Sequence, residues 1–232
     1  MWKRRCPLTW RRWQENEVSK AFGLLIFDWD GTLVDSLARI VTCLQISSGE
    51  LGLPVPSDED SREIIGLGLP QALAKLFPGA EREEFLALRE CYSRNFQDID
   101  REPAPFYPTA RETLEELKNK GYLLAVATGK SRRGLDRALQ GHALTDFFDA
   151  SRCADESVSK PDPRMLFELL EHFGLPADTA CMVGDTEFDM DMAARAGVAR
   201  IGVSYGAHGA DRLHGYSLRG CAATFDEILA WV

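Results

Sequence analysis

The sequence lacks the features that would place the chain in a membrane or among secreted, disulfide-linked proteins. No apolar run is long enough to span a bilayer, so no membrane partner is expected. The cysteines are scattered without a C-x-x-C pair, which predicts neither a zinc site nor a disulfide framework and favours a reducing, cytoplasmic compartment. They are Cys6, Cys43, Cys91, Cys153, Cys181 and Cys221.

Basic charge is also scarce. The chain has 27 Lys+Arg against 36 Asp+Glu, a formal net charge of −9. Proteins that bind nucleic acid present a basic face, so no nucleic-acid partner is expected. The exception is segment 1–20, which carries six Lys+Arg, two Glu and three tryptophans. Because this segment has no apolar stretch of the kind found in secretory signals, we interpret it as a disordered leader or as a segment foreign to the native protein.

The most informative stretch is an apolar run that ends in two carboxylates. Residues 24–27 are predicted to form a buried parallel strand, and Asp28, Asp30 and Gly31 follow it. Open α/β sheets bind ligands at the carboxyl ends of their strands. Two carboxylates there suit a nucleophile beside a general acid/base, or a pair of metal ligands. A plain turn would also contain Asp and Gly, so this pattern alone is weak.

Strand and helix patterns alternate along the chain, except in one long segment. Strands are predicted at 123–127, 181–183 and 200–203, and helices at 109–120, 131–140, 163–173, 187–196 and 225–231. This alternation is typical of an α/β fold with a doubly wound, Rossmann-like parallel sheet. Residues 37–106 show only helical patterns, which predicts an inserted all-helical cap between core segments 21–36 and 107–232.

Two further motifs offer groups that could hold a phosphate. Thr128 and Gly129 end the second predicted strand, where a hydroxyl and exposed backbone N–H groups can bind phosphate oxygens. Thr-Gly is also a common sequence in the turn that connects a strand to a helix. Lys160 precedes a proline in a stiff loop, where a fixed cation could balance phosphoryl charge, although most lysines are simply solvated.

The third predicted strand is followed by another pair of carboxylates. Asp185 ends the strand and Asp189 comes four residues later, a spacing that would put both on one helix face. Acidic residues in a first helical turn also stabilise the helix dipole, which is the plainer interpretation. Hard oxygen ligands beside a phosphate favour Mg²⁺.

The string from Asp28 to Ser36, DWDGTLVDS, resembles the first motif of the haloacid dehalogenase superfamily. With the Thr128, Lys160 and Asp185 segments in the same order, the chain is similar to hydrolases of the phosphoglycolate phosphatase-like group. The helical insert resembles the cap of that group, whereas residues 1–20 have no counterpart in it.

The resemblance implies a role for each residue of the catalytic motifs. Asp28 would be the nucleophile and form an aspartyl-phosphate. Asp30 would protonate the leaving oxygen and then deprotonate the attacking water. Thr128 and Gly129 would bind the phosphoryl group, and Lys160 would stabilise its charge.

The resemblance also implies a magnesium ion. The Asp28 carboxylate, the Asp30 backbone carbonyl and the Asp185 carboxylate would hold it, and Asp189 would orient this shell. Carboxylates repel a phosphate dianion, so the metal and the lysine must neutralise that repulsion.

The implied reaction is hydrolysis of a small phosphomonoester, with phosphoglycolate as the best single candidate. A phosphomutase similar to β-phosphoglucomutase, a nucleotide or pyrophosphate hydrolase, and a catalytically idle regulatory protein stay open. The segment 37–106 carries seven Lys+Arg and twelve Asp+Glu, which disfavours a large polyanion. Gly66 and Gly68 belong either to a loop that contacts the substrate or to a plain helix–helix turn. We expect a monomer or a homodimer.

Overall fold

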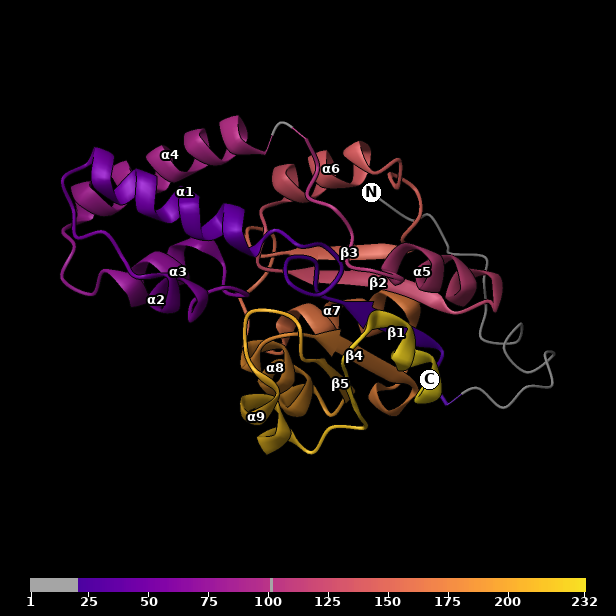
Figure 1. Ribbon diagram of the computed structural model, residues 1–232. Helices are drawn as coiled ribbons and strands as arrows, with labels where there is room; N and C mark the ends of the chain where they lie inside the picture. Colours follow the sequence, from indigo (N-terminus) through magenta and orange to yellow (C-terminus); the bar gives the residue numbers. More distant parts are fainter. Residues whose placement is uncertain (1–20, 101) are drawn as a thin grey trace, which may run out of the picture.

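The protein is built on one parallel sheet. The computed structural model describes residues 21–100 and 102–232 (Figure 1). In these residues six strands lie in the order β3-β2-β1-β4-β5-β6, and each neighbouring pair is parallel. They are β1 (Leu24–Phe27), β2 (Leu123–Thr128), β3 (Ala150–Cys153), β4 (Ala180–Gly184), β5 (Ala199–Val203) and β6 (Cys221–Ala222). The prediction of a doubly wound α/β fold is confirmed.

The apolar run of β1 fills two cores, one on each face of the sheet. Leu25 and Phe27 belong to one core, whereas Leu24 and Ile26 belong to the other. Successive residues of a strand point to opposite faces, so a central strand covered on both sides has to be apolar throughout. One face is covered by α5 (Ala110–Asn119), α6 (Arg132–Gly141) and the 3-10 helix η4 (Phe225–Ala230), the other by α7 (Arg164–Phe173) and α8 (Glu187–Ala196).

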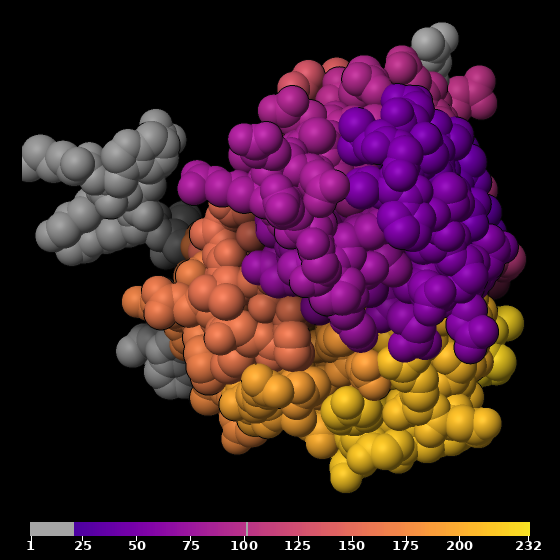
Figure 2. Space-filling view, turned by 90° about the vertical axis from the view of Figure 1, so that its left-hand side faces the viewer, coloured from indigo at the N-terminus to yellow at the C-terminus, as the bar shows by residue number. Residues whose placement is uncertain are grey.

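The described residues between β1 and α5 form helices with an apolar cluster of their own. These are α1 (Leu37–Glu50), α2 (Asp58–Arg62), α3 (Leu69–Leu76) and α4 (Arg82–Ile99), which we call the cap. Leu44, Leu73 and Leu88 are buried at its centre. The cap lies beyond one end of the sheet (Figure 1), and its indigo and magenta surface rests on the orange and yellow C-terminal half in Figure 2. Among the described residues, no helix is long and apolar enough to cross a membrane.

The two segments that join the cap to the sheet run together. The Asp35 N–H donates a 2.8 Å hydrogen bond to the Pro105 carbonyl, and Val34 and Phe106 form an antiparallel bridge. We expect a single paired connection of this kind to let the cap pivot as a unit on the sheet. The predicted leader, residues 1–20, lies outside the described residues.

Three details differ from the sequence-based expectations. Strands β3 and β6 were not predicted, because β3 is the partly polar run Ala-Ser-Arg-Cys and β6 has only two residues. The last predicted helix is a 3-10 helix. The expectation that Asp185 and Asp189 share a helix face was wrong, since α8 begins at Glu187 and Asp185 precedes it.

Candidate active site

The predicted site residues meet at one edge of the sheet. Asp28 follows β1, Thr128 ends β2, and Asp185 follows β4, the strand on the other side of β1. The carboxyl ends of parallel strands share an edge, so residues far apart in sequence come together there. Lys160 reaches the same place from the loop that precedes α7.

Lys160 is a buried cation between two carboxylates. Its Nζ lies 2.8 Å from Oδ1 of Asp28 and donates a 2.6 Å hydrogen bond to Oδ1 of Asp189. Burial alone would lower the pKa of Lys160, but Asp189 and Asp28 raise it above its ordinary value. Lys160 therefore keeps its charge at neutral pH and can offset negative charge at Asp28.

The Asp28 carboxylate is buried but poorly satisfied. Neither oxygen has a hydrogen-bond partner in the described part of the chain, since Lys160 faces Oδ1 at short range without hydrogen-bond alignment. Burial raises the pKa of Asp28 well above its usual value; Lys160 opposes this, and Asp189 and Asp185 add to it. Buried polar atoms normally have partners, so this carboxylate is arranged for a ligand or a reactant.

Asp185 is held by donors and by two close backbone segments. Thr32 Oγ1 donates to its Oδ1 and the Ala207 N–H donates to its Oδ2, each over 2.7 Å. A Cβ at Gly31 or at Gly206 would lie 2.2 Å from an atom of Asp185, and Gly31 has φ +84°. Only glycine tolerates both demands at position 31. Burial is the main cause that raises the pKa of Asp185 to about 7.

The carboxylates of Asp28, Asp185 and Asp189 fit a divalent cation. One oxygen from each lies within 4.8 Å of the others, and all three side chains are buried. Oδ2 of Asp189 accepts hydrogen bonds from the backbone N–H and the hydroxyl of Thr186, at 3.1 and 2.7 Å, which fixes its orientation. Carboxylate oxygens in a negatively charged cluster, with those of Asp28 accepting no hydrogen bond from the described residues, are the donor set that Mg²⁺ prefers.

Asp30 lies beside this cluster and has different partners. Ser36 Oγ donates a 2.6 Å hydrogen bond to its Oδ1, and Lys130 Nζ donates to Oδ1 and Oδ2 over 2.8 and 2.9 Å. The carboxylate of Asp30 is not one of the three in the metal-type cluster, so only its backbone carbonyl could serve the ligand role that the resemblance implies.

A loop of the cap lies directly on the end of β2. A Cβ on Gly129 would be 2.5 Å from the Leu67 carbonyl oxygen and 2.8 Å from that of Gly66. The Gly68 N–H donates a 2.7 Å hydrogen bond to Oγ of Ser159, the residue before Lys160. The cap is therefore docked on the core in this structure, and the loop touches the segments that carry Thr128 and Lys160.

The docked cap and the sheet edge enclose a cavity of about 410 Å³. Its core side includes Asp28, Asp30, Thr128 and Gly129, and Gly66 also lines it, whereas Gly68 faces the loop around Ser159 instead. The cap contributes mostly apolar side chains, among them Ile40, Leu44, Ile64, Leu69, Tyr92 and Phe96. Volumes of roughly 300–1,000 Å³ are usual for small-molecule sites.

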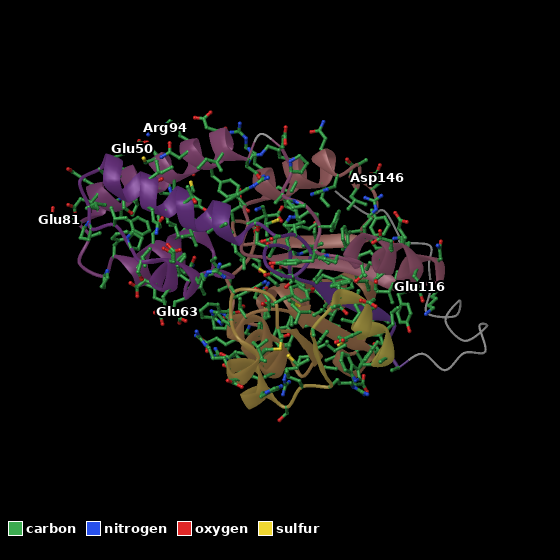
Figure 3. The ribbon with its side chains drawn as sticks, viewed as in Figure 1. Glu50, Glu63, Glu81, Arg94, Glu116 and Asp146 are labelled. Carbon is green, nitrogen blue, oxygen red and sulfur yellow. The ribbon has the colours of Figure 1, made fainter. Side chains whose placement is uncertain are left out.

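An ion-pair bridge also joins cap and core. Arg212 of α9 (Ala210–Leu213) pairs with Glu63 at the end of α2 and, over 2.6 Å, with Glu187 of α8. Figure 3 shows Glu63 on the side of the cap that faces these helices, while Glu50 and Arg94 pair on its outer side. The bridge is partly exposed, so it contributes modestly, on the order of 1 kcal/mol.

Several contacts of the site were missed from the sequence. Thr32 and Ser36 lie within the first motif, but only the structure shows that their hydroxyls hold Asp185 and Asp30. Lys130 directly follows Thr128 and Gly129 in the sequence, but only the structure shows that it is the partner of Asp30. The signal in each case was a polar residue within a motif or directly after it.

The fold and this site define a class of enzyme. A doubly wound sheet that gathers a metal-type carboxylate cluster and a buried lysine–aspartate ion pair at its strand ends suits metal-assisted hydrolysis or phosphoryl transfer. Residues 25–203 match the family described as haloacid dehalogenase-like hydrolase. The chain belongs to this family, and the predicted phosphoglycolate phosphatase-like group is confirmed by its relatives.

The relatives are phosphatases by name. "Probable phosphatase IndB" of Dickeya dadantii is 35% identical over 89% of this chain and 91% of its own length. A phosphoglycolate phosphatase of Haemophilus influenzae is 32% identical over 82% of this chain and 88% of its own. The crystal structure of a predicted phosphoglycolate phosphatase from Haemophilus somnus has a TM-score of 0.82 at 26% identity, covering 92% of this chain and 99% of that one. The expectation of an enzyme of the phosphatase type is confirmed.

Proposed function

We propose that the protein is a Mg²⁺-dependent phosphatase that hydrolyses a small phosphomonoester through an aspartyl-phosphate on Asp28. The observation that carries this proposal is the Asp28 carboxylate, which is buried, lacks hydrogen-bond partners among the described residues, faces a cavity and has Lys160 2.8 Å away. Structural carboxylates are satisfied, whereas a nucleophile has to keep an oxygen free for the reaction.

In the proposed first step, four residues share the work. Asp28 attacks the phosphorus while Thr128 Oγ1 and the backbone after it hold the phosphoryl oxygens. Lys160 offsets the charge that collects on Asp28 and on those oxygens. Asp30, which enters this step in its protonated form, gives its proton to the departing oxygen as the P–O bond breaks, so the leaving group departs as an alcohol.

The second step reverses the role of Asp30. It takes a proton from a water molecule that attacks the phosphorus of the aspartyl-phosphate, which frees phosphate and restores Asp28. The bound Mg²⁺ would supply charge neutralisation for a dianion that meets several carboxylates. Asp28, Asp185 and the Asp30 carbonyl would hold the metal, with Asp189 fixed behind them by Thr186 and Lys160.

Phosphoglycolate is the first substrate to test, because several relatives are named for its hydrolysis. The cavity can hold a small phosphorylated metabolite, and the cap rather than the core would distinguish one ester from another. The cysteines of the described residues are free and mostly buried, which suits a reducing cytoplasm.

The proposal is tested by phosphate release from a panel of small phosphoesters, with phosphoglycolate and p-nitrophenyl phosphate included. We expect turnover in Mg²⁺, none in EDTA, recovery when Mg²⁺ is restored, and loss of at least a thousandfold in Asp28→Asn. Acid-quenched protein should carry covalent phosphate that Asp28→Asn does not form. Turnover of Asp28→Asn within tenfold of the parent, or full turnover in EDTA, would refute the mechanism, and isomerised substrate without phosphate release would indicate a mutase.

A further inference from the structure

Lys130 connects the cap to Asp30. Its Nζ donates to both carboxylate oxygens of Asp30, at 2.8 and 2.9 Å, and lies 4.9 Å from the ring centre of Phe96 on α4. We propose that Lys130 is a positioning residue that orients Asp30 toward the leaving group, and that the docked cap completes this arrangement through Phe96. The inference rests on the proposed function, since it assigns a helper to its acid/base residue.

The contacts of Asp30 show why it needs such a helper. Ser36 Oγ reaches only Oδ1, and Lys130 is the one donor recorded for Oδ2 in the described residues. A carboxylate held at one oxygen can rotate about its last torsion, which is broad and roughly two-fold. A second donor that bridges both oxygens, as Lys130 does, restrains this rotation. Lys130 therefore decides which oxygen faces the cavity and at what angle.

Lys130 is itself held in place and is not a solvated surface lysine. Its N–H donates to Thr128 Oγ1 over 3.2 Å, its carbonyl accepts from the Ala154 N–H over 3.0 Å, and its side chain is only 11% exposed. The backbone of the phosphate-binding turn and the lysine that holds Asp30 are thus one continuous unit. A cation withdrawn from water in this way interacts strongly with a carboxylate partner.

The contact with Phe96 links this unit to the cap. Phe96 is buried and stacks on Tyr92, with ring centres 5.7 Å apart, and both line the cavity. An ammonium over an aromatic face is attracted by the ring, most strongly when both are desolvated. Because Phe96 belongs to the cap and Lys130 to the core, this attraction exists only with the cap docked. Docking therefore restrains Lys130, and through it Asp30.

The test uses the dependence of the rate on the leaving group. A well-placed acid matters for an alkoxide but little for p-nitrophenolate, which leaves without protonation. We expect Lys130→Met to lower kcat/KM for ethyl phosphate by roughly 30–100-fold, as a misplaced catalytic group does. The same variant should lose less than about threefold with p-nitrophenyl phosphate. Lys130→Arg, which keeps the charge and two donors, should restore most of the ethyl phosphate activity.

Two further variants separate positioning from general damage. Arg164→Met removes an exposed cation from the first turn of α7, where Arg164 pairs with Glu168 and does not line the cavity, and it should leave the ratio of the two rates unchanged. Phe96→Leu should lower the ethyl phosphate rate selectively, by about threefold or more, and it tests the inference even if Lys130→Met does not fold.

Equal losses for both esters in Lys130→Met, or no rescue by arginine, would overturn the inference. The proposed function would survive that result, because the parent would still hydrolyse both esters in Mg²⁺. A parent that hydrolyses neither ester under any condition would refute the proposed function instead. The two failures are therefore distinguishable in one set of assays.

Discussion

Replacing Gly129 by alanine should uncouple the cap from the core. The new Cβ would lie 2.5 Å from the carbonyl oxygen of Leu67 and 2.8 Å from that of Gly66. These atoms are backbone, so they cannot rotate away as a flexible side chain would. The docked loop must move away by roughly 1 Å to restore ordinary van der Waals contact. This movement breaks the hydrogen bond that the Gly68 N–H donates to Oγ of Ser159.

The size of the effect follows from the cost of overpacking. An added methyl group in a well-packed place costs about 1–3 kcal/mol. Because the cap can pivot on its paired connection, this cost falls on docking rather than on the folding of the sheet. Each 1.4 kcal/mol is tenfold, so the equilibrium constant for docking should fall by about 5–150-fold, and this factor is the largest loss expected in kcat/KM. The melting temperature should stay close to that of the parent.

The assay is steady-state hydrolysis of ethyl phosphate beside thermal unfolding of the same preparation. The matched control is Gly79→Ala, also a glycine-to-alanine change in a loop, where a Cβ would meet nothing within 4 Å. It should match the parent in both measurements. Gly129→Ala with kcat/KM within twofold of the parent would refute the idea that a docked cap is needed. A large fall in melting temperature would show instead that this contact supports the fold.

Three other outcomes follow from the site. Burial raises the pKa of Asp185 to about 7 in the metal-free protein, so this group favours folding below about pH 4 and loses that contribution as the pH rises to 7. Mg²⁺ should therefore raise the melting temperature more at pH 8 than at pH 5.5. Equal increases in melting temperature at the two pH values would contradict the assignment of Asp185 as a metal ligand. Asp185→Ala should abolish that increase, which is checked by the same thermal unfolding. A Cβ on Gly68 would lie 2.9 Å from Ala154 and 3.0 Å from Ser159. Gly68→Val should therefore lower the hydrolysis rate of every ester in the panel by a similar factor. A changed ranking of the substrates would show instead that this loop contacts the substrate.

The sequence by itself determined the sheet and the edge at which the chemistry lies. A short uninterrupted apolar run such as 24–27, followed by Asp and Gly, predicts a strand covered on both faces, and polar residues directly after such parallel strands meet at their carboxyl ends. Asp28, Thr128 and Asp185 were predictable for that reason, since each is placed by the local strand pattern and not by distant contacts. The short strands β3 and β6 escaped prediction because edge strands carry no such apolar pattern.

Only the tertiary structure decided which polar groups pair. Lys160 contacts Asp189 as well as Asp28, and Lys130 contacts Asp30, because the loops after different strands are stacked beside one another. The docking of the cap, seen in the contact of Leu67 with Gly129, also depends on how a pivoting unit meets the sheet. No periodicity along the chain encodes such contacts. They arise when buried charges must find partners in a space that the whole fold defines.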